Sequence, residues 1–144
     1  MSKVNSYSDE RRVIESRLRV LFKDPDVPLQ FDNMPELFYN TGEQTEISKV
    51  EKFVRLNILS FDSTPIGISE HRDRQIGEVQ LTVFVKQNIG SQAALEIADD
   101  LYSIYNRQTD EQIRFRSTYR SPPVSENGWF QIALSTPFEW DRCA

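Results

Sequence analysis

The chain has 144 residues, a formal net charge of −5 at pH 7 and 38% hydrophobic residues, which suits one domain with its own core and argues against a nucleic-acid binder that relies on a basic surface. Cys143 is the single cysteine, so an internal disulfide is excluded and a reducing compartment is indicated. The polar first nine residues predict no signal peptide, and no apolar run approaches the ~20 residues of a membrane span.

The first predicted element is an amphipathic helix over residues 8–22. Its apolar side chains recur at the spacing of one helix face, at Ile14, Leu18, Leu21 and Phe22. Ser8 suits the N-cap position, because a serine hydroxyl accepts a hydrogen bond from an early backbone N–H. Pro25 prevents the helix from continuing, since proline lacks the N–H that a further turn needs.

Residues 28–74 are expected to lead into the sheet. Residues 28–33 predict a short edge strand, and residues 34–48 a long connection with irregular strand structure. Residues 53–61 alternate apolar and polar side chains, which is typical of a half-buried strand. Residues 62–74 contain a proline, a glycine and several charged side chains, and they predict a loop that is long for a hairpin.

The second half of the chain adds a strand, a helix and two further strands. Residues 75–86 show the clearest alternation, and residues 91–105 return to helical spacing with small side chains in the first turn. Residues 113–120 and 129–138 alternate again and predict the last two strands.

The order is therefore helix, short strand, two strands, helix, two strands. Strands joined by short or moderate links favour antiparallel pairing. The sequence predicts one α+β domain over residues 1–144, a mainly antiparallel sheet with two helices packed on one face. Residues 1–7 and 141–144 are expected to be flexible ends.

No catalytic, cofactor or metal site is predicted, and the chain is not expected to be an enzyme. The glycines form no phosphate-binding pattern, and zinc-protease, paired-cysteine and serine-nucleophile motifs are absent. His71 is the single histidine, which favours a solvated loop residue over a metal ligand or a triad member. Asp62, Glu70 and Asp73 would gather Mg²⁺ only if the predicted loop folded around the ion.

Arginine and tryptophan side chains supply the candidate partner-binding residues. Arg114, Arg116 and Arg120 fall on one face of the predicted strand, as a stripe that either meets an acidic partner or is the ordinary solvent face of a sheet. Trp129 follows a predicted turn and is expected to pack in the core. Trp140 is expected to anchor an interface, because tryptophan is enriched at binding hot spots.

Short segments between residues 13 and 138 occur in a characteristic order and spacing. They read IESRL at 14–18, VRLNI at 54–58, GEVQLTVFV at 77–85, AAL at 93–95, RFR at 114–116, GWFQI at 128–132 and PF at 137–138. In this order they resemble the tail terminator proteins of long, non-contractile phage tails, found in virions and prophages. The turn SPPVSE at 121–126 departs from the RPVGE expected for that family, and Phe53 stands where a tryptophan is expected.

The resemblance implies an α+β subunit of the virion tail, assembled in the host cytoplasm, that forms a hexameric ring on the head-proximal end of the finished tail tube. Such a ring ends polymerisation of the tube and provides the surface for head–tail joining. The implied partners are other copies of the chain, the tail tube protein and a head completion or neck protein. No cofactor, membrane or specific nucleic acid is implied, although DNA passes through a ring of this kind.

Arg72 and Arg74 lie on the predicted long loop of an acidic protein. We hypothesise that they contact the tube or an adjacent subunit. Charge reversal of both would then disturb ring formation or tail capping, and intact capping would contradict the hypothesis.

Three alternatives stay open at the level of the sequence. Another neck or head completion protein would also be small, acidic and without catalytic motifs. A small enzyme would use residues 62–74 as a metal-dependent or hydrolytic site, and metal would stabilise it thermally in a manner lost with His71→Ala. A monomeric cellular binding module would stay monomeric at every concentration and ignore tube protein.

Overall fold

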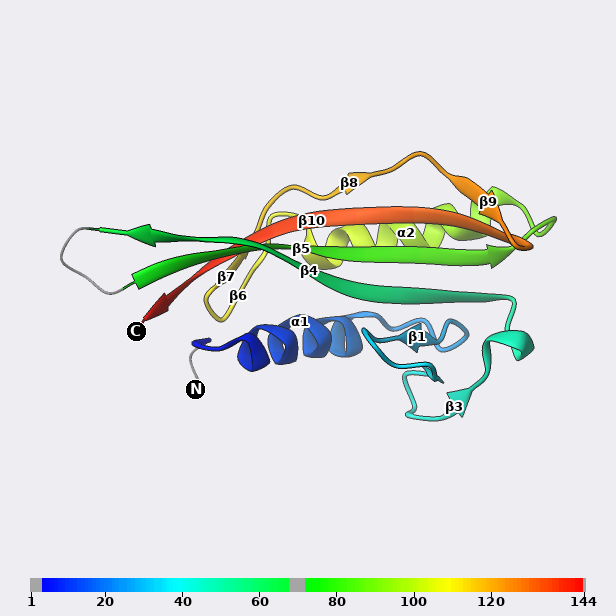
Figure 1. The fold of residues 1–144 in the computed structure, drawn as a ribbon. Coiled ribbons are helices and arrows are strands. Elements are labelled where there is room, and N and C mark those ends of the chain that lie inside the picture. Colours follow the sequence, from blue (N-terminus) through cyan, green and yellow to red (C-terminus); the bar gives the residue numbers. More distant parts are fainter. Residues whose placement is uncertain (1–3, 68–71, 144) are drawn as a thin grey trace.

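The computed structural model describes residues 4–67 and 72–143, arranged as Figure 1 shows. The amino-terminal half contains α1 (Tyr7–Leu21), β1 (Leu29–Gln30), β2 (Leu37–Phe38), β3 (Gln44–Thr45), the 3-10 helix η1 (Ile47–Lys49) and β4 (Lys52–Ile66). The carboxy-terminal half contains β5 (Arg72–Lys86), α2 (Ser91–Tyr105), β6 (Thr109–Asp110), β7 (Ile113–Phe115), β8 (Tyr119–Arg120), β9 (Val124–Glu126) and β10 (Trp129–Cys143). This order confirms the predicted α+β class.

The strands of the described residues form one sheet in the order β3-β2-β1-β4-β5-β10-β7-β6, with β8 and β9 also paired to β10. The long strands β4, β5 and β10 run antiparallel, with Val54 opposite Val83 and Val83 opposite Ile132. β1 pairs parallel with β4, so the sheet is mixed but mostly antiparallel.

Both helices cover the same face of the sheet, called here the helix face. The alternate side chains of β5 predicted to share a face are all buried there, at Val79, Leu81, Val83 and Val85. The Tyr105 hydroxyl on α2 donates a hydrogen bond of 2.7 Å to the carbonyl oxygen of Ile14 on α1, and burial raises the pKa of Tyr105. The predicted packing of two helices on one face is therefore confirmed.

A smaller aromatic cluster lies on the opposite face, called here the outer face. The rings of Phe53 and Phe84 stack with centroids 4.5 Å apart, and Trp129 meets Phe53 edge-on at 5.3 Å. Leu37, from the segment expected to be an irregular connection, and Val50, just before β4, cover this cluster. Trp129 therefore packs against a core cluster, as predicted.

Two local expectations in the first third of the chain are wrong. The N-cap of α1 is Ser6 and not Ser8, since the Ser6 hydroxyl oxygen accepts the backbone N–H of Asp9 at 3.0 Å. β1 is not an edge strand, because it lies between β2 and β4. The chain folds back through β2 and β3 and so covers the edge that β1 would otherwise expose.

The predicted loop over residues 62–74 is also wrong, because its described parts continue β4 and β5. The register of the two strands shifts between Ser60 and Ser63, so a β-bulge marks the point where the sequence loses its alternation. Beyond the bulge the two strands project past the helices as an antiparallel pair (Figure 1). We call residues 60–66 and 72–77 the arm. Glu70 and His71 lie outside the described residues.

The predicted strand over residues 113–120 is interrupted. Phe115 pairs with Phe138 of β10, whereas Tyr119 pairs with Ser135 of the same strand. Tyr119 is four residues after Phe115, but Ser135 is only three residues before Phe138. One extra residue between β7 and β8 reverses the face to which the following side chains point.

Described residues near both ends of the chain contact the rest of the domain. Val4 is buried in the main core. β10 runs to Cys143, and its last three residues pair with residues 72–74 of β5. Strand pairing satisfies the backbone hydrogen bonds of a segment whose sequence alone carries no alternating pattern.

Candidate interaction surface

Four arginines gather around two carboxylates on the outer face at the base of the arm. Arg74 lies 3.0 Å from Asp141 and 3.4 Å from Glu139, measured between the guanidinium Nε and the carboxylate oxygens. The other three guanidiniums are those of Arg72, which pairs with Asp141, of Arg116, which pairs with Glu139, and of Arg114, which contacts both carboxylates at 3.7 Å. We call these six residues the arginine cluster. It carries a surplus of two positive charges in an acidic protein.

The arginines of this cluster hold Asp141 in its charged form. Burial raises the pKa of Asp141, but the hydrogen bond and charge of Arg74, with the charges of Arg114 and Arg72, outweigh burial and lower it. The hydrogen bond and charge of Asp141 raise the pKa of Arg74 in return. Both shifts favour the charged forms of the Arg74–Asp141 pair.

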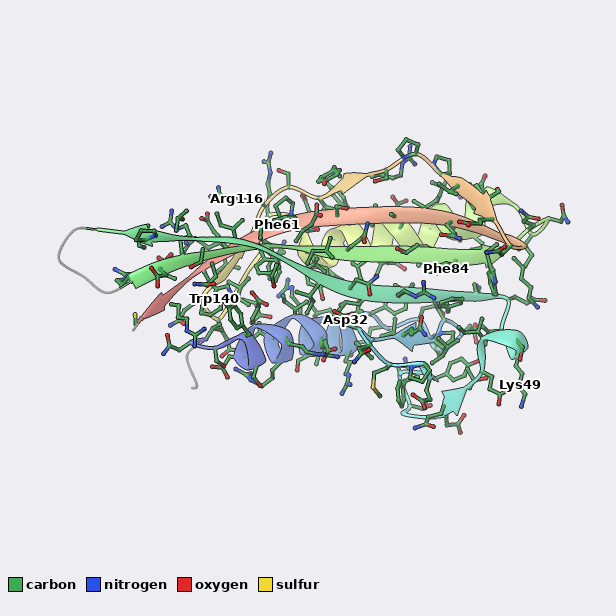
Figure 2. The ribbon with its side chains drawn as sticks, in the orientation of Figure 1. Asp32, Lys49, Phe61, Phe84, Arg116 and Trp140 are labelled. Atoms are coloured by element: carbon green, nitrogen blue, oxygen red, sulfur yellow. The ribbon has the colours of Figure 1, made fainter. Side chains whose placement is uncertain are left out.

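The arginines predicted to form one stripe do not all face the same way. Arg114 lies opposite Glu139 on the outer face, whereas Arg120 lies opposite Leu134, whose side chain points to the helix face. The extra residue between β7 and β8 causes this reversal. Arg116 projects from the side of the sheet away from α1 in Figure 2, and its side chain is 64% exposed.

The other predicted partner-binding residues also need correction. Arg72 and Arg74 lie on a strand, and carboxylates of the same chain pair with them, so contact with a partner stays a prediction. The interface assignment of Trp140 is wrong, because this side chain is fully buried between the sheet and α1 (Figure 2). Its indole N–H donates a hydrogen bond of 2.8 Å to Glu10 Oε1.

The opposite end of the molecule is acidic. Residues 23–52 contain seven acidic residues and three lysines, a net charge of −4. Glu43, Glu46 and Glu51 are exposed, and no carboxylate of this segment pairs with a cation elsewhere in the described residues. We call residues 23–52 the acidic end. Figure 1 places it and the arm at opposite ends of the long axis.

The arm exposes apolar side chains next to the arginine cluster. Phe61, at the bulge of β4, is 57% exposed, and Ile76 of β5 is 37% exposed. Three features prevent another strand from pairing with the β4 edge near Phe61. Asp32 already accepts the backbone N–H of Ile58 at 3.2 Å, and the bulge between Ser60 and Ser63 interrupts the regular backbone. Pro65 has no N–H to donate. Contacts of the arm with a partner would therefore run through side chains.

A hollow of about 350 Å³ lies at the acidic end, between the end of α1 and the β2–β3 hairpin. Leu29, Phe31 and Phe38 supply its apolar lining, and Tyr39 forms part of its rim. The guanidinium carbon of Arg19 lies 4.6 Å from the centre of the Phe31 ring. We call this feature the aromatic hollow. Sequence reasoning missed it because its lining comes from short segments without periodicity.

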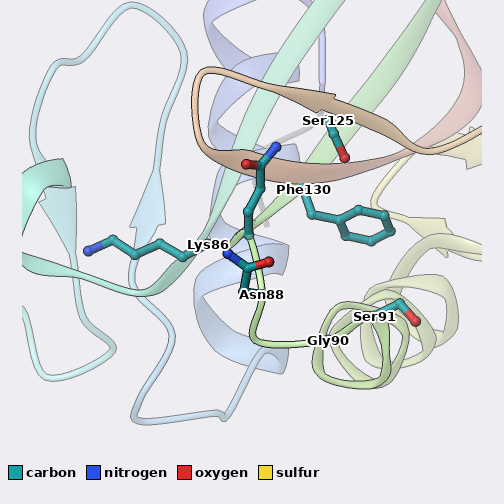
Figure 3. Close-up of a pocket in the computed structure, with 7 residues that line it drawn as sticks. Lys86, Asn88, Gly90, Ser91, Ser125 and Phe130 are labelled. Carbon is teal, nitrogen blue, oxygen red and sulfur yellow. The ribbon is translucent and has the colours of Figure 1, made fainter.

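Another hollow, of about 400 Å³, lies beside the start of α2 (Figure 3). Its lining is mostly polar and uncharged, including Asn88, Ser91 and Ser125. Lys86, the charged residue of this lining, extends to the side of β5 away from Phe130. No pair of acid and base groups converges within this lining.

The next two observations concern the described part of the chain, residues 4–67 and 72–143. No group of three or more His, Cys, Asp or Glu side chains there is placed to hold a metal ion. None of the helices there has the length and apolar content to cross a membrane.

Comparison with known proteins finds no matching family model and no curated relative. Solved structures do share the fold. One of them, whose name states no function, is similar with a TM-score of 0.69 and 17% sequence identity over 94% of this chain and 95% of that chain. At this identity the likeness shows the fold alone.

Proposed function

We propose that the protein is a structural subunit that closes head to tail into a ring, and that the ring is the terminator of a phage tail tube. The observation that carries the proposal is the separation of charge along the molecule. A surplus of arginine lies at one end, and carboxylates without an ion pair to the rest of the described residues lie at the other. Opposite charges at opposite ends favour a contact between unlike surfaces of two copies.

A contact between unlike surfaces either closes into a ring or continues as a filament. Attraction between the arginine cluster of one copy and the acidic end of the next repeats at every subunit. The resemblance of segments 14–18 to 137–138 to tail terminators favours closure, and it supplies the proposed partners, the tail tube protein and a head completion protein.

The test is assembly of tube protein with and without the purified chain, followed by electron microscopy of tube length. A terminator is expected to give tubes of bounded length with a ring at one end, whereas its omission is expected to give overlong tubes. Unchanged tube lengths in both samples would contradict the proposal.

Particles assembled without the protein separate the proposal from the nearest alternative. Loss of a terminator is expected to give overlong tails, because nothing stops tube growth. Loss of another neck protein would instead give tails of normal length that fail to join heads, and that result would replace the proposal.

A further inference from the structure

We infer that Phe61, on the arm of one copy, inserts into the aromatic hollow of the next copy and anchors the subunit contact. The inference rests on the proposed head-to-tail ring and names the side chains that join the copies. Phe61 is 57% exposed at the β-bulge of β4, and nothing in the described residues covers it. Large aromatic residues at the centre of a contact commonly carry much of its binding energy.

The hollow matches a phenyl ring in size and chemistry. An apolar cavity of about 150 Å³ accommodates a benzene ring, so a hollow of about 350 Å³ holds a phenylalanine side chain with part of its backbone. Leu29 and Phe31 are each only 4% exposed, so the floor of the hollow is apolar.

The rim of the hollow is held in place before any partner arrives. The backbone N–H of Gly42 donates a hydrogen bond of 2.9 Å to the carbonyl oxygen of Tyr39. The backbone N–H of Tyr39 donates one of 2.9 Å to the carbonyl oxygen of Glu43. Gly42 has a φ of +93°, which glycine adopts without strain. A preformed site loses less conformational entropy on binding than a flexible one.

Charge selects the second copy as the occupant. The hollow lies within the acidic end, and Glu43, which follows the lining residue Gly42 in the chain, is exposed. Phe61 lies beside the arginine cluster, which carries the surplus of positive charge. In Figure 2 Phe61 and Arg116 project from the same side of the sheet. In Figure 2 Phe61 lies on the side of the sheet away from α1, whereas the hollow lies beside the end of α1, so Phe61 reaches a hollow only in another copy.

Cysteine crosslinking tests the contact directly. Phe61→Cys is combined with Tyr39→Cys in a Cys143→Ser background, and mild oxidation is followed by a non-reducing gel. A ladder of covalent multimers is expected, because each copy carries one half of the contact at each end. The matched control pairs Tyr39→Cys with Tyr102→Cys, since Tyr102 is 46% exposed on α2. The control is expected to give no ladder, and equal ladders in both would overturn the inference.

Association measured by light scattering supplies the second readout. Phe61→Ala is expected to weaken association roughly 30-fold, while Tyr102→Ala leaves it unchanged, with thermal melting showing that both variants fold. A ring that persists in Phe61→Ala and gives no Phe61→Cys crosslink overturns the inference and leaves the proposed ring intact. A wild-type chain that neither associates nor changes tube length overturns both.

Discussion

Glu10 and Trp140 form a buried polar pair that joins the first helix to the last strand. The two side chains are 6% and 0% exposed. Burial raises the pKa of Glu10, and the hydrogen bond from the indole N–H opposes this only in part. Trp140 therefore has a structural role in place of the binding role that its position near the end of the chain suggested.

Replacement of Glu10 separates the hydrogen bond from the charge. Glu10→Ala leaves the buried indole N–H without its acceptor and is expected to lower the free energy of unfolding by about 1–3 kcal/mol. Glu10→Gln keeps an acceptor and removes the charge, so its stability at pH 7 is expected to equal or exceed that of the wild type. Urea denaturation measures both, with exposed Glu126→Gln as the control.

The pH dependence has a definite sign. The pKa of Glu10 is higher in the folded than in the unfolded state, so the unfolded state releases its proton first as the pH rises. The stability contribution of protonated Glu10 is therefore full below the ordinary glutamate value of about 4.3 and is lost as the pH rises through the folded value. Glu10→Gln is expected to lack this decline, and an identical decline in both proteins would contradict the assignment.

At the scale of elements, the crossing of β4, β5 and β10 is closely packed around Gly77. A Cβ at this position would lie 2.5 Å from Cζ of Phe138 and 2.7 Å from the carbonyl oxygen of Leu59. Glycine therefore lets the strands approach where the arm leaves the body of the domain. The nearby bulge and this close approach together set the direction of the arm.

Gly77→Ala is expected to cost about 1–3 kcal/mol of unfolding free energy, because the buried ring and the backbone oxygen must both move. Phe138→Leu in the same chain is expected to restore part of that cost by relieving the ring contact. A double-mutant cycle measured by urea denaturation gives the coupling between the two sites. Strict additivity would show that the ring does not limit the approach.

The whole molecule is polar along its long axis, and its association should depend on salt. Raising the salt concentration from low to about 1 M shortens the screening length from tens of ångströms to about 3 Å. Attraction between the acidic end and the arginine cluster is therefore expected to fall, and light scattering should record weaker association.

Charge reversal locates this dependence. Changing Glu43, Glu46 and Glu51 to lysine is expected to weaken association about tenfold or more, since each exposed pair contributes about 0.2–1 kcal/mol and becomes repulsive. The matched control changes Glu96, Asp99 and Asp100, which are exposed on α2, to lysine. Equal effects of the two triple variants would indicate a general effect of net charge.

Much of the fold follows from local patterns. Residues close together in the chain determine the alternation along β5 and β10 and the helical spacing in α1 and α2. For this reason the α+β class, the order of the long elements and the two helices on one face were predicted from the sequence. The ends of those elements were not, because strand pairing extended β4, β5 and β10 beyond their alternating segments.

The sequence by itself determined which residues alternate, which helices are amphipathic and that the chain is acidic. The tertiary structure decided which charges lie together, that Trp140 is buried and that Arg120 turns away from Arg114. The physical reason is that a single extra residue between β7 and β8 reverses the side chains of β8, and such a shift comes from pairing with β10 and not from local preference. Long-range pairing also explains the arginine cluster, because β5, β7 and β10 are distant in sequence and bring its arginines and carboxylates together.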